Sequence, residues 1–373
     1  MLIQKRILIL IFLSLSLFSK EIFSETVEEI VVLGDWRETS TDQEDSSVVL
    51  LDAKKIKSQS MKHFEQLSYL VPNLNFAASD SRARYFQIRG IGERSGYQGT
   101  PNSSVGFLID DIDYSGQGGI ATTFDVDQIE IHRGPQGSRI GANALAGLIY
   151  IKTKDPTEEF EATSEITTGS FGTKSAGLAF GGPLANNKNI AYRLVLRKDN
   201  SDGFRKNLYL KRSDTSRKDE TTSRLKIDWE MDEKTSVKLL ISQVDLDDPA
   251  DIWTLDGSLN TLSDRPGMDS QKTNSYGLKI FHNFIRFELQ SLTSSTDTSV
   301  VFSYDADWGN TDSWAPFIYD YFSETLRDRK TFSQEFRLIS DEANLDEEQK
   351  IEWVFGVSYL EIKESNLKID DGN

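Results

Sequence analysis

The sequence contains no cysteine and only three histidines among its 373 residues. The absence of cysteine excludes disulfide frameworks, thiolate metal sites and cysteine nucleophiles. The histidines are His63, His132 and His282, which are too scattered to suggest a histidine-based metal site. Proline is scarce at 8 residues, whereas glycine is plentiful at 25, a balance that suits many tight turns between strands. These counts argue against an enzyme.

The chain has fewer basic than acidic residues, and this argues against a nucleic-acid-binding protein. The chain carries 42 Lys and Arg against 59 Asp and Glu, a formal net charge of −17. A nucleic-acid-binding protein needs clustered basic residues to displace counterions, so we expect no nucleic-acid partner. The length allows two or three ordinary domains with a sizeable core.

The N-terminus, residues 1–24, has the layout of a secretory signal peptide. Lys5 and Arg6 precede a mostly apolar run, 7–18, and Ser24 is a small residue before a cleavage site near Glu25. The run is shorter than the roughly 20 residues that span a bilayer as a helix, and an uncleaved anchor is the alternative. No later apolar stretch reaches that length, so a mature chain that enters a membrane must do so as a β-barrel.

The rest of the chain changes character near residue 157. Residues 25–47 hold a short β-like segment and a polar linker. Residues 48–157 are punctuated by glycine, with one helix-like stretch at 64–69. Residues 158–373 contain roughly ten strand-length segments separated by polar connections.

These segments alternate with the period of a strand. In 190–197, Ile190, Tyr192, Leu194 and Leu196 lie on one face and Ala191, Arg193, Val195 and Arg197 on the other. Segments 225–230, 285–290 and 353–359 behave similarly. One face of such a strand can meet lipid and the other a wet lumen, but a soluble sheet with one solvated face gives the same pattern. Export, segment length and the contrast between short connections (183–188, 230–236) and long ones (244–271, 305–328) favour an outer-membrane barrel.

Several short motifs have two interpretations each. The segment 28–34, EEIVVLG, has high β-propensity and can add a strand to another protein's sheet edge, or it is a first strand of the following domain. Asp110, Asp111 and Asp113 are close enough for a metal, but hairpin-turn acids fit better because the Ca²⁺-loop pattern is absent. His132 and Arg133 lack a nucleophile beside them, so we interpret Arg133 as bonding turn carbonyls.

At this point the residues resemble a known family. The segments FQIRGIG (86–92), VGFLIDDIDY (105–114) and VDQIEIHRGPQGSRIGANALAGLIYIKTKDP (126–156) resemble the plug domain of TonB-dependent outer-membrane receptors, and EEIVVLG resembles their TonB box. The similarity covers about 28–157 in order, and the barrel half rests on pattern alone. Leu33 and the second acid of LIDD depart from the family's usual residues, which leaves partner affinity open.

The resemblance implies site residues. The TonB-contacting residues would be Glu29, Ile30, Val31, Val32 and Leu33. Ligand-contact candidates on the plug apices, 79–84, 94–98 and 114–120, are Arg82, Arg84, Arg94, Tyr97 and Gln98. For each arginine, a salt bridge to the barrel wall is the alternative. The structural motif of the plug would comprise Arg89, Gly90, Arg133, Gly134, Pro135, Gly137 and Gly147.

The predicted fold is mainly β: a small α+β plug, 48–157, followed by antiparallel transmembrane barrel strands, 158–373. By resemblance the complete barrel has 22 strands around the plug. A plug of about 130 residues has a diameter near 35 Å, which ten strands cannot enclose, and ten strands leave two open edges. The last residues, KIDDGN, stop in a turn. We therefore expect a truncated or partial chain.

The resemblance also implies a function. We expect a monomeric receptor in the Gram-negative outer membrane, in contact with lipid and lipopolysaccharide. It would take up a ferric siderophore or other iron complex with proton-motive force delivered through TonB. Alternatives are a receptor for cobalamin, an oligosaccharide or another nutrient, or a fragment that at most binds ligand. We predict no catalytic residues, no resident metal and no cofactor. The acidic stretch 245–251 could hold Ca²⁺ or bridge to lipopolysaccharide through divalent ions, with a solvated loop as the alternative.

Overall fold

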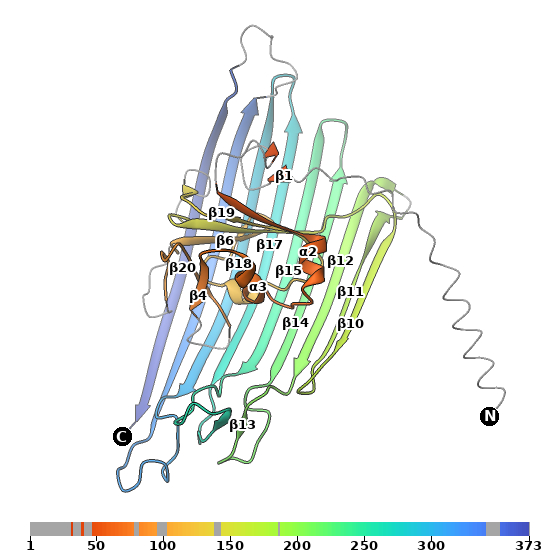
Figure 1. The fold of residues 1–373 in the computed structure, drawn as a ribbon. Helices are drawn as coiled ribbons and strands as arrows, with labels where there is room; N and C mark the ends of the chain where they lie inside the picture. The colour runs from red at the N-terminus through yellow and green to blue at the C-terminus, as the bar shows by residue number, and fades with distance from the viewer. Residues whose placement is uncertain are drawn as a thin grey trace, which may run out of the picture.

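The computed structural model describes residues 31–32, 39–40, 47–77, 82–94, 103–137, 143–185, 187–340 and 351–372. A small N-terminal domain lies against one face of a large, tilted antiparallel sheet (Figure 1). We call the small domain the plug and the large sheet the wall. None of the helices within the described residues is long and apolar enough to cross a membrane.

A five-stranded mixed sheet forms the centre of the plug. In spatial order its strands are β3 (Val48–Asp52), β8 (Val126–His132), β9 (Gly147–Thr153), β6 (Val105–Ile109) and β7 (Ile112–Asp113). Strands β6 and β9 run parallel, and the other neighbours are antiparallel. A separate hairpin pairs β4 (Leu74–Ala77) with β5 (Tyr85–Ile88).

The tight turn between β6 and β7 confirms the prediction of hairpin-turn acids. Asp110 and Asp111 both adopt positive φ, 51° and 70°. Two residues with positive φ in succession form a two-residue hairpin turn whose twist matches that of the flanking strands. The helix-like stretch at 64–69 is also confirmed, as α3 (Phe64–Leu67) followed by the 3-10 turn Ser68–Leu70. The sequence reading missed α2 (Ala53–Ser58), which Asp52 caps by accepting from the Lys55 amide.

Aromatic packing holds the plug helices on its strands. Phe64 of α3 lies with its ring centroid 5.2 Å from that of Phe86 and 5.7 Å from that of Phe107, and the last two rings stack. At the edge of this cluster, Gly147 permits β9 to approach β8. A Cβ there would lie 2.3 Å from the carbonyl oxygen of His132, so the close strand packing requires glycine.

Nine strands form the wall in the described residues, one fewer than the roughly ten predicted from the sequence. They are β10 (Glu161–Thr168), β11 (Lys174–Leu184), β12 (Asn187–Ser201), β14 (Lys218–Glu230), β15 (Thr235–Pro249), β17 (Met268–Asn283), β18 (Phe287–Asp305), β19 (Tyr321–Ser340) and β20 (Val354–Gly372). Each pairs antiparallel with the next, and β10 and β20 lie at the two edges.

The connections of the wall differ between its two ends. One end carries the loops 202–217, 250–267 and 306–320, and we call it the long-loop end (Figure 1, bottom). Short connections such as 231–234 and 284–286 lie at the other, short-turn end. The two kinds of connection were predicted, but the long loops are shorter than expected because β15, β17, β18 and β19 extend further. The short strands β13 (Lys206–Asn207) and β16 (Asn260–Thr261) pair in parallel between two of these loops.

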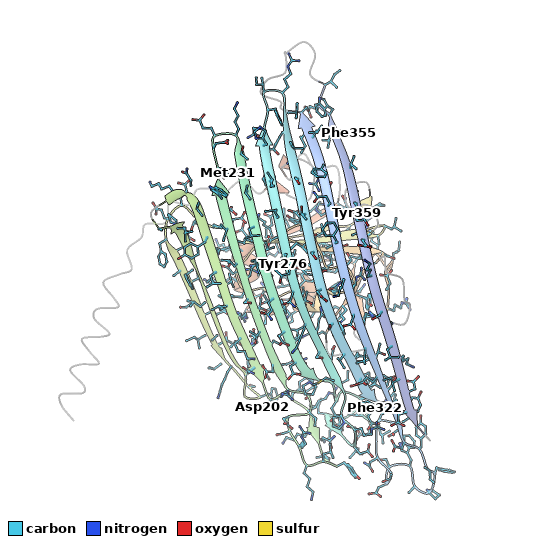
Figure 2. The ribbon with its side chains drawn as sticks, turned by 180° about the vertical axis from the view of Figure 1, so that it is seen from behind. Asp202, Met231, Tyr276, Phe322, Phe355 and Tyr359 are labelled. Carbon is cyan, nitrogen blue, oxygen red and sulfur yellow. The ribbon has the colours of Figure 1, made fainter. Side chains whose placement is uncertain are left out.

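Alternation along the wall strands follows the prediction for β12 and β14. Residues such as Ile190, Leu194 and Ile227 point away from the plug, and Figure 2 shows this outward face with Tyr276 and Tyr359 labelled. The opposite face was expected to meet a wet lumen. Instead Arg193 and Arg197 are 2% and 4% exposed, because the plug and neighbouring side chains cover them. The segment 285–290 begins its strand only at Phe287, and Ile285 lies in the preceding turn.

Candidate functional site

The interior of the molecule, between plug and wall, contains the predicted plug arginines. Arg82 is buried, and its guanidinium meets three acids: Glu65 of the plug, Glu220 of β14 and Asp248 of β15. The Nη1–Oε1 distance to Glu65 is 2.9 Å, and the Nε–Oδ2 distance to Asp248 is 3.5 Å. The Arg82 amide also donates to Asp269 Oδ2 at 3.0 Å. This geometry is the alternative considered for Arg82, a salt bridge to the wall.

Arg84 is anchored in the same way, one strand further along. Its guanidinium contacts Asp269 of β17 and donates through Nε to Gln271 Oε1 at 3.2 Å. Both ends of the ion pair are buried, with side chains 3% and 0% exposed. We call these contacts of Arg82 and Arg84 with Glu220, Asp248 and Asp269 the long-loop band, because the wall acids lie toward that end.

His63 joins the long-loop band from the N-terminus of α3. Its Nε2 lies 2.7 Å from Glu220 Oε2. Burial, and next the positive charge of Arg82, lower the pKa of His63 to about 3. The imidazole is therefore neutral at physiological pH and donates a hydrogen bond to Glu220.

A second group of ion pairs has the opposite polarity and lies nearer the short-turn end and the middle of the wall. Here the plug supplies acids and the wall supplies bases. Lys226 of β14 places its Nζ 3.0 Å from Asp110 Oδ1, 2.9 Å from Asp155 Oδ1 and 3.0 Å from the carbonyl oxygen of Thr153. We call this group the short-turn band, and it also includes Lys279 with Asp111 and Arg193 and Arg224 with Asp125.

Asp110 is a buried acid of the short-turn band. It accepts from both the amide and the hydroxyl of Thr153, at 3.0 Å and 2.5 Å. Burial acts to raise the pKa of Asp110, but the nearby ammonium of Lys226 and further cations outweigh it and hold that pKa below its ordinary value. The carboxylate is therefore ionised inside the protein, and this requires that Lys226 stay charged beside it.

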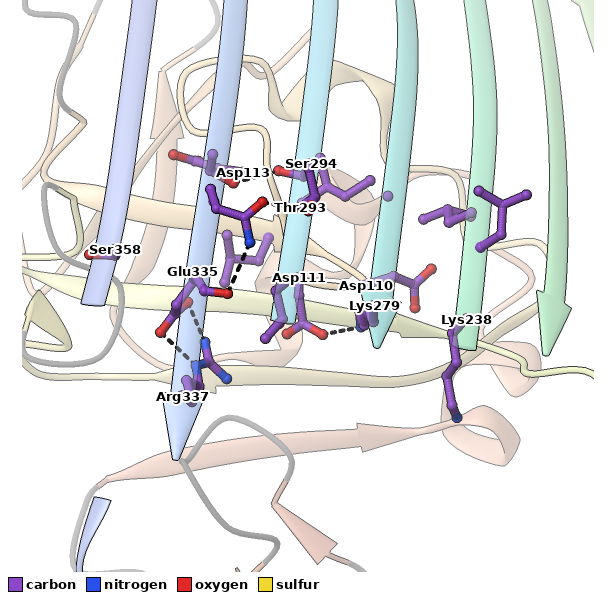
Figure 3. Close-up of a pocket in the computed structure, with 18 of the residues that line it drawn as sticks. Asp110, Asp111, Asp113, Lys238, Lys279, Thr293, Ser294, Glu335, Arg337 and Ser358 are labelled. Carbon is purple, nitrogen blue, oxygen red and sulfur yellow. Dashed lines mark hydrogen bonds and ion pairs between the residues drawn. The ribbon is translucent and has the colours of Figure 1, made fainter. Parts of the chain in front are cut away.

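A cavity of about 330 Å³ opens next to the short-turn band, between the β6–β7 turn and the wall (Figure 3). Asp111 and Lys279 form an ion pair across it, and Arg337 binds Glu335 through two parallel bonds of 2.5 and 2.6 Å. Most charges that line the cavity thus have a partner of opposite sign, and Asp113 accepts hydrogen bonds from Ser115 and Asn143 instead. Among the described residues, no group of three or more His, Asp or Glu side chains is placed to hold a metal ion.

An aromatic cluster lies at the long-loop end, beside the point where Arg84 meets the wall. The ring centroids of Trp253 and Tyr304 are 4.8 Å apart, and Phe302 stacks on Tyr304 at 5.6 Å. Phe302 is the cross-strand partner of Asp269. One strand further, Arg327 donates to the hydroxyl of Tyr85 in the plug at 2.6 Å. We call Trp253, Phe302 and Tyr304 the aromatic cluster.

The remaining predicted residues are spread over the plug. Arg94 is exposed, and Tyr97 and Gln98 lie outside the described residues. Ligand contact by these three, and by Arg82 and Arg84, stays a prediction. Of the predicted TonB-contacting residues, Val31 and Val32 form strand β1, whose backbone pairs with β2 (Thr39–Ser40). Glu29, Ile30 and Leu33 lie outside the described residues, as does the segment 1–24.

The predicted structural motif falls on turns of the plug. Arg89 and Gly90 follow β5 with φ of 54° and 80°. Arg133 follows β8 and donates to the Ser47 hydroxyl at 2.8 Å and to the Pro72 carbonyl at 3.5 Å, as the structural interpretation of this arginine anticipated. Gly134, Pro135 and Gly137 continue that turn, and Gly147 begins β9.

The acidic stretch 245–251 is not a loop. Asp245, Asp247 and Asp248 belong to β15, where alternation points the first two outward and buries Asp248 against Arg82 and Lys218. Asp251 is buried in the adjacent loop and accepts from Asn207, Thr261 and Ser263. These carboxylates therefore already have protein partners, which corrects the expectation of an open acidic loop.

The wall residues of the two bands were not identified from the sequence. Glu220, Asp269 and Lys226 occupy the inward positions of alternating strands, so their direction was readable. Their partners were not, because the contacts of the two bands join residues 68 to 187 positions apart.

The plug and the chain as a whole are similar to known proteins. Residues 40–148, which cover most of the plug, match the family model described as TonB-dependent Receptor Plug Domain. The sequence is 22% identical over 159 residues to the ferripyoverdine receptor of Pseudomonas aeruginosa, covering 42% of this chain and 19% of that protein. It is 24% identical over 206 residues to the ferric enterobactin receptor PirA of the same organism, covering 49% of this chain and 28% of that protein.

Solved structures show the same architecture. The ferric yersiniabactin uptake receptor FyuA from Yersinia pestis superposes with a TM-score of 0.74 at 17% identity, covering 87% of this chain and 50% of that one. The siderophore receptor PiuA from Acinetobacter baumannii gives 0.68 at 16% identity, covering 86% and 46%. This chain thus spans about half the length of these structures, and less of the curated relatives.

Residues 40–148 thus match the plug domain of TonB-dependent receptors, and the strands that follow have the fold of the barrel strands in these solved structures. The resemblance inferred from the sequence is confirmed, as is the mainly β fold of a small α+β plug and antiparallel barrel strands. The family consists of receptors rather than enzymes.

Proposed function

We propose that this chain belongs to an outer-membrane receptor that takes up a ferric siderophore or another iron complex, driven by proton-motive force through TonB. One observation carries the proposal: a plug of the TonB-dependent type is fixed to barrel-type strands by two buried bands of ion pairs. A plug held by these ion pairs blocks the passage through the barrel until energy is supplied to move it. The named relatives receive ferripyoverdine and ferric enterobactin, which supports an iron chelate as ligand.

The two ends of the wall give the orientation. Barrels of the outer membrane have short periplasmic turns and longer extracellular loops. The long-loop end is therefore extracellular, and the outward apolar residues form the lipid-facing surface. Export would follow from the predicted signal peptide, residues 1–24. As proposed partners we keep TonB, which would pair with residues 29–33, and the lipids of the membrane, and we expect a monomer without cofactor.

The extracellular side of the plug is the proposed ligand site. Arg82 and Arg84 are engaged by wall acids, and Arg94, Tyr97 and Gln98 are kept as predicted ligand contacts. The aromatic cluster lies at the same end and offers ring faces to a planar chelating group. Arg327 lies on the neighbouring strand β19, two residues from the residue that pairs with Phe302. Ring stacking and a neighbouring guanidinium suit an anionic, aromatic chelate.

Uptake of radioactive iron by cells that carry or lack the gene tests the proposal. The probes are ferripyoverdine, ferric enterobactin and ferric yersiniabactin, each with and without a proton ionophore. We expect gene-dependent uptake of at least one chelate, abolished by the ionophore. Equal uptake with and without the gene for all three, or uptake that ignores the ionophore, would overturn the iron and energy parts respectively.

A variant pair tests the coupling to TonB. Ile30→Pro removes a backbone donor from the segment that would pair with the partner's sheet edge, so uptake should fall at least about tenfold while ligand binding to cells stays. Thr41→Pro, in the following linker, is the matched control and should retain uptake. Loss of binding together with uptake would instead indicate a role in the ligand site. Competition by cobalamin or an oligosaccharide would favour the alternative ligands.

A further inference from the structure

A buried group of polar side chains joins two loops at the long-loop end of the wall. We call it the loop knot, and it consists of Asp251, Asn207, Thr261 and Ser263, each at most 4% exposed. Asp251 Oδ2 accepts from Asn207 Nδ2 at 3.0 Å and from Thr261 Oγ1 at 2.6 Å. Its Oδ1 accepts from Ser263 Oγ at 2.8 Å. One carboxylate therefore binds donors from its own loop and from the loop 202–217.

The backbone joins the same two loops at the loop knot. Strands β13 and β16 pair in parallel, and the Leu208 amide donates to the carbonyl oxygen of Thr261 at 3.0 Å (Figure 1). The Asp251 amide donates to the carbonyl oxygen of Thr215 at 3.3 Å. Each of the two strands has only two residues, and a pair this short is not stable by itself. The two loops therefore depend on the buried side chains of the loop knot to stay together.

Trp253 of the aromatic cluster follows Asp251 by two residues in the same loop. Its ring centroid lies 4.8 Å from that of Tyr304 and 6.3 Å from that of Phe302. The last two residues belong to β18 and are held by the wall, whereas Trp253 lies in a loop whose residues 255–257 are exposed. Asp251 is the buried residue nearest to Trp253 in the chain, so the position of this ring depends on the loop knot.

We propose that Asp251 is a positioning residue of the ligand site, which holds Trp253 against Tyr304 before any ligand arrives. The proposal rests on the proposed function, because it concerns the ligand site given there. Hydrogen bonds to an ionised acceptor are roughly twice as strong as those between neutral groups, so a carboxylate with three donors fixes its loop firmly. A ring that is already in place needs no ordering when the ligand binds, and this raises the affinity.

The loop knot lies outside the hydrogen-bonded ladder of the wall. Strands β15 and β17 pair from Thr235 with His282 to Pro249 with Met268, and the loop 250–267 connects them beyond that last pair. Removal of the Asp251 carboxylate should thus loosen the loop and leave the strand pairing in place. The position of Trp253 can therefore be measured separately from the stability of the fold.

Acrylamide quenching of tryptophan fluorescence tests the positioning without any ligand. The receptor is purified from outer membranes in mild detergent, and the signal of Trp253 is the difference that Trp253→Phe makes in each background. We expect Asp251→Ala to raise the quenching constant of Trp253 about twofold or more, because the loop opens to solvent more often. Equal quenching in Asp251→Ala and the unmodified receptor would overturn the proposal.

Two further variants show that the carboxylate itself is responsible. Asp251→Asn keeps an oxygen that accepts from Asn207 and Thr261, and its amide can donate to the Ser263 hydroxyl, so Trp253 should be quenched less than in Asp251→Ala. Asp312→Ala removes an exposed acid from the loop 306–320 and should leave the quenching of Trp253 unchanged.

A double-mutant cycle on binding tests the role in the ligand site. Ferripyoverdine, ferric enterobactin and ferric yersiniabactin are bound to cells treated with the proton ionophore, so that uptake does not contribute. We expect Trp253→Ala and Asp251→Ala each to weaken binding about tenfold, and the double variant to bind no more weakly than Trp253→Ala. A residue that acts through Trp253 has nothing left to position once that ring is removed. Additive losses would overturn the proposal, because Asp251 would then support the site or the fold in another way.

These experiments fail separately from the proposed function. Normal binding and uptake in Asp251→Ala would overturn the positioning role and leave the transporter. If the unmodified receptor bound none of the three chelates, the iron part of the proposed function would be contradicted. The quenching experiment would still decide whether Asp251 holds Trp253 in place.

Discussion

The two faces of the wall contain the same kind of ion pair in two environments. Lys226 and Asp110 on the inward side are 3.0 Å apart, and so are Lys330 and Asp297 on the outward side. The inward side chains are 7% and 4% exposed, whereas the outward ones are 65% and 50% exposed. The two ion pairs therefore have the same distance between their charged atoms and differ in their exposure to water.

This difference in exposure determines what each kind of ion pair can do. A buried charge that loses its partner is left without solvent, so inward pairs fix the plug to the wall. An exposed charge that loses its partner gains water or another ion, so outward pairs contribute little to the stability of the fold. The following changes would break or sharpen this comparison.

The largest effect should come from Lys226→Ala. It leaves Asp110 and Asp155 without their buried cation, and we expect a loss of about 3–5 kcal/mol in the free energy of unfolding. Urea titration of the protein in lipid vesicles measures this loss. Lys330→Ala is the matched control, and similar losses in the two variants would contradict the comparison.

Acidification should be next in size, through His63. The folded protein has a His63 pKa of about 3, against an ordinary value of 6.5, so below pH 6.5 the unfolded chain takes up a proton that the folded one refuses. The contribution of His63 to stability is thus complete above pH 6.5 and declines as the pH falls toward 3. The decline is at most about 1.4 kcal/mol per pH unit. Thermal unfolding between pH 7 and 4.5 measures it, and His63→Gln should flatten the slope. An unchanged slope in that variant would rule out His63 as its origin.

A double-mutant cycle on Arg84 and Asp269 should give a coupling energy of about 0.5–3 kcal/mol, because both side chains are buried in one network. Each alanine variant and the double variant are compared by urea titration. The outward pair Lys272 and Asp245 provides the reference cycle, with an expected coupling of about 0.2–1 kcal/mol. A larger coupling in the outward pair would reverse the assignment of roles.

The smallest effect should come from Lys330→Ala. The side chain is mostly exposed, so its removal should change the free energy of unfolding by less than about 1 kcal/mol. A loss of several kcal/mol would contradict the comparison between the two faces.

Local features of the fold were predictable from the sequence. The alternation in 190–197, the hairpin at Asp110 and Asp111, and the helical turn after His63 each depend on neighbours within a few residues. The short helix α2 was missed because its six residues, Ala53–Ser58, contain three lysines and bury only Ile56, too little for a periodic signal.

The site was less predictable, for a physical reason. Arg82 and Arg84 were predicted as ligand contacts, with a salt bridge to the barrel wall as the alternative, and the choice between the two depends on which acids face them. Glu220 and Asp269 reach them only through the register of strands that begin more than 130 residues later. No local pattern contains that register, whereas the resemblance of the plug to its family predicted the domain and the alternation predicted which residues share a face of a strand.

The connectivity of the wall also determines an order of assembly. Apart from the short excursions β13 and β16, every strand pairs with its successor in the chain, so the wall can grow as a series of hairpins with inexpensive loop closure. The contacts between plug and wall join residues 68 to 242 positions apart, from Arg193 with Asp125 to Arg327 with Tyr85, so the last of them cannot form until β19 exists. During synthesis the plug thus emerges first but completes its charge pairing last. Until those strands are in place, the charges of Asp110 and Arg84 have water as their partner instead of the wall.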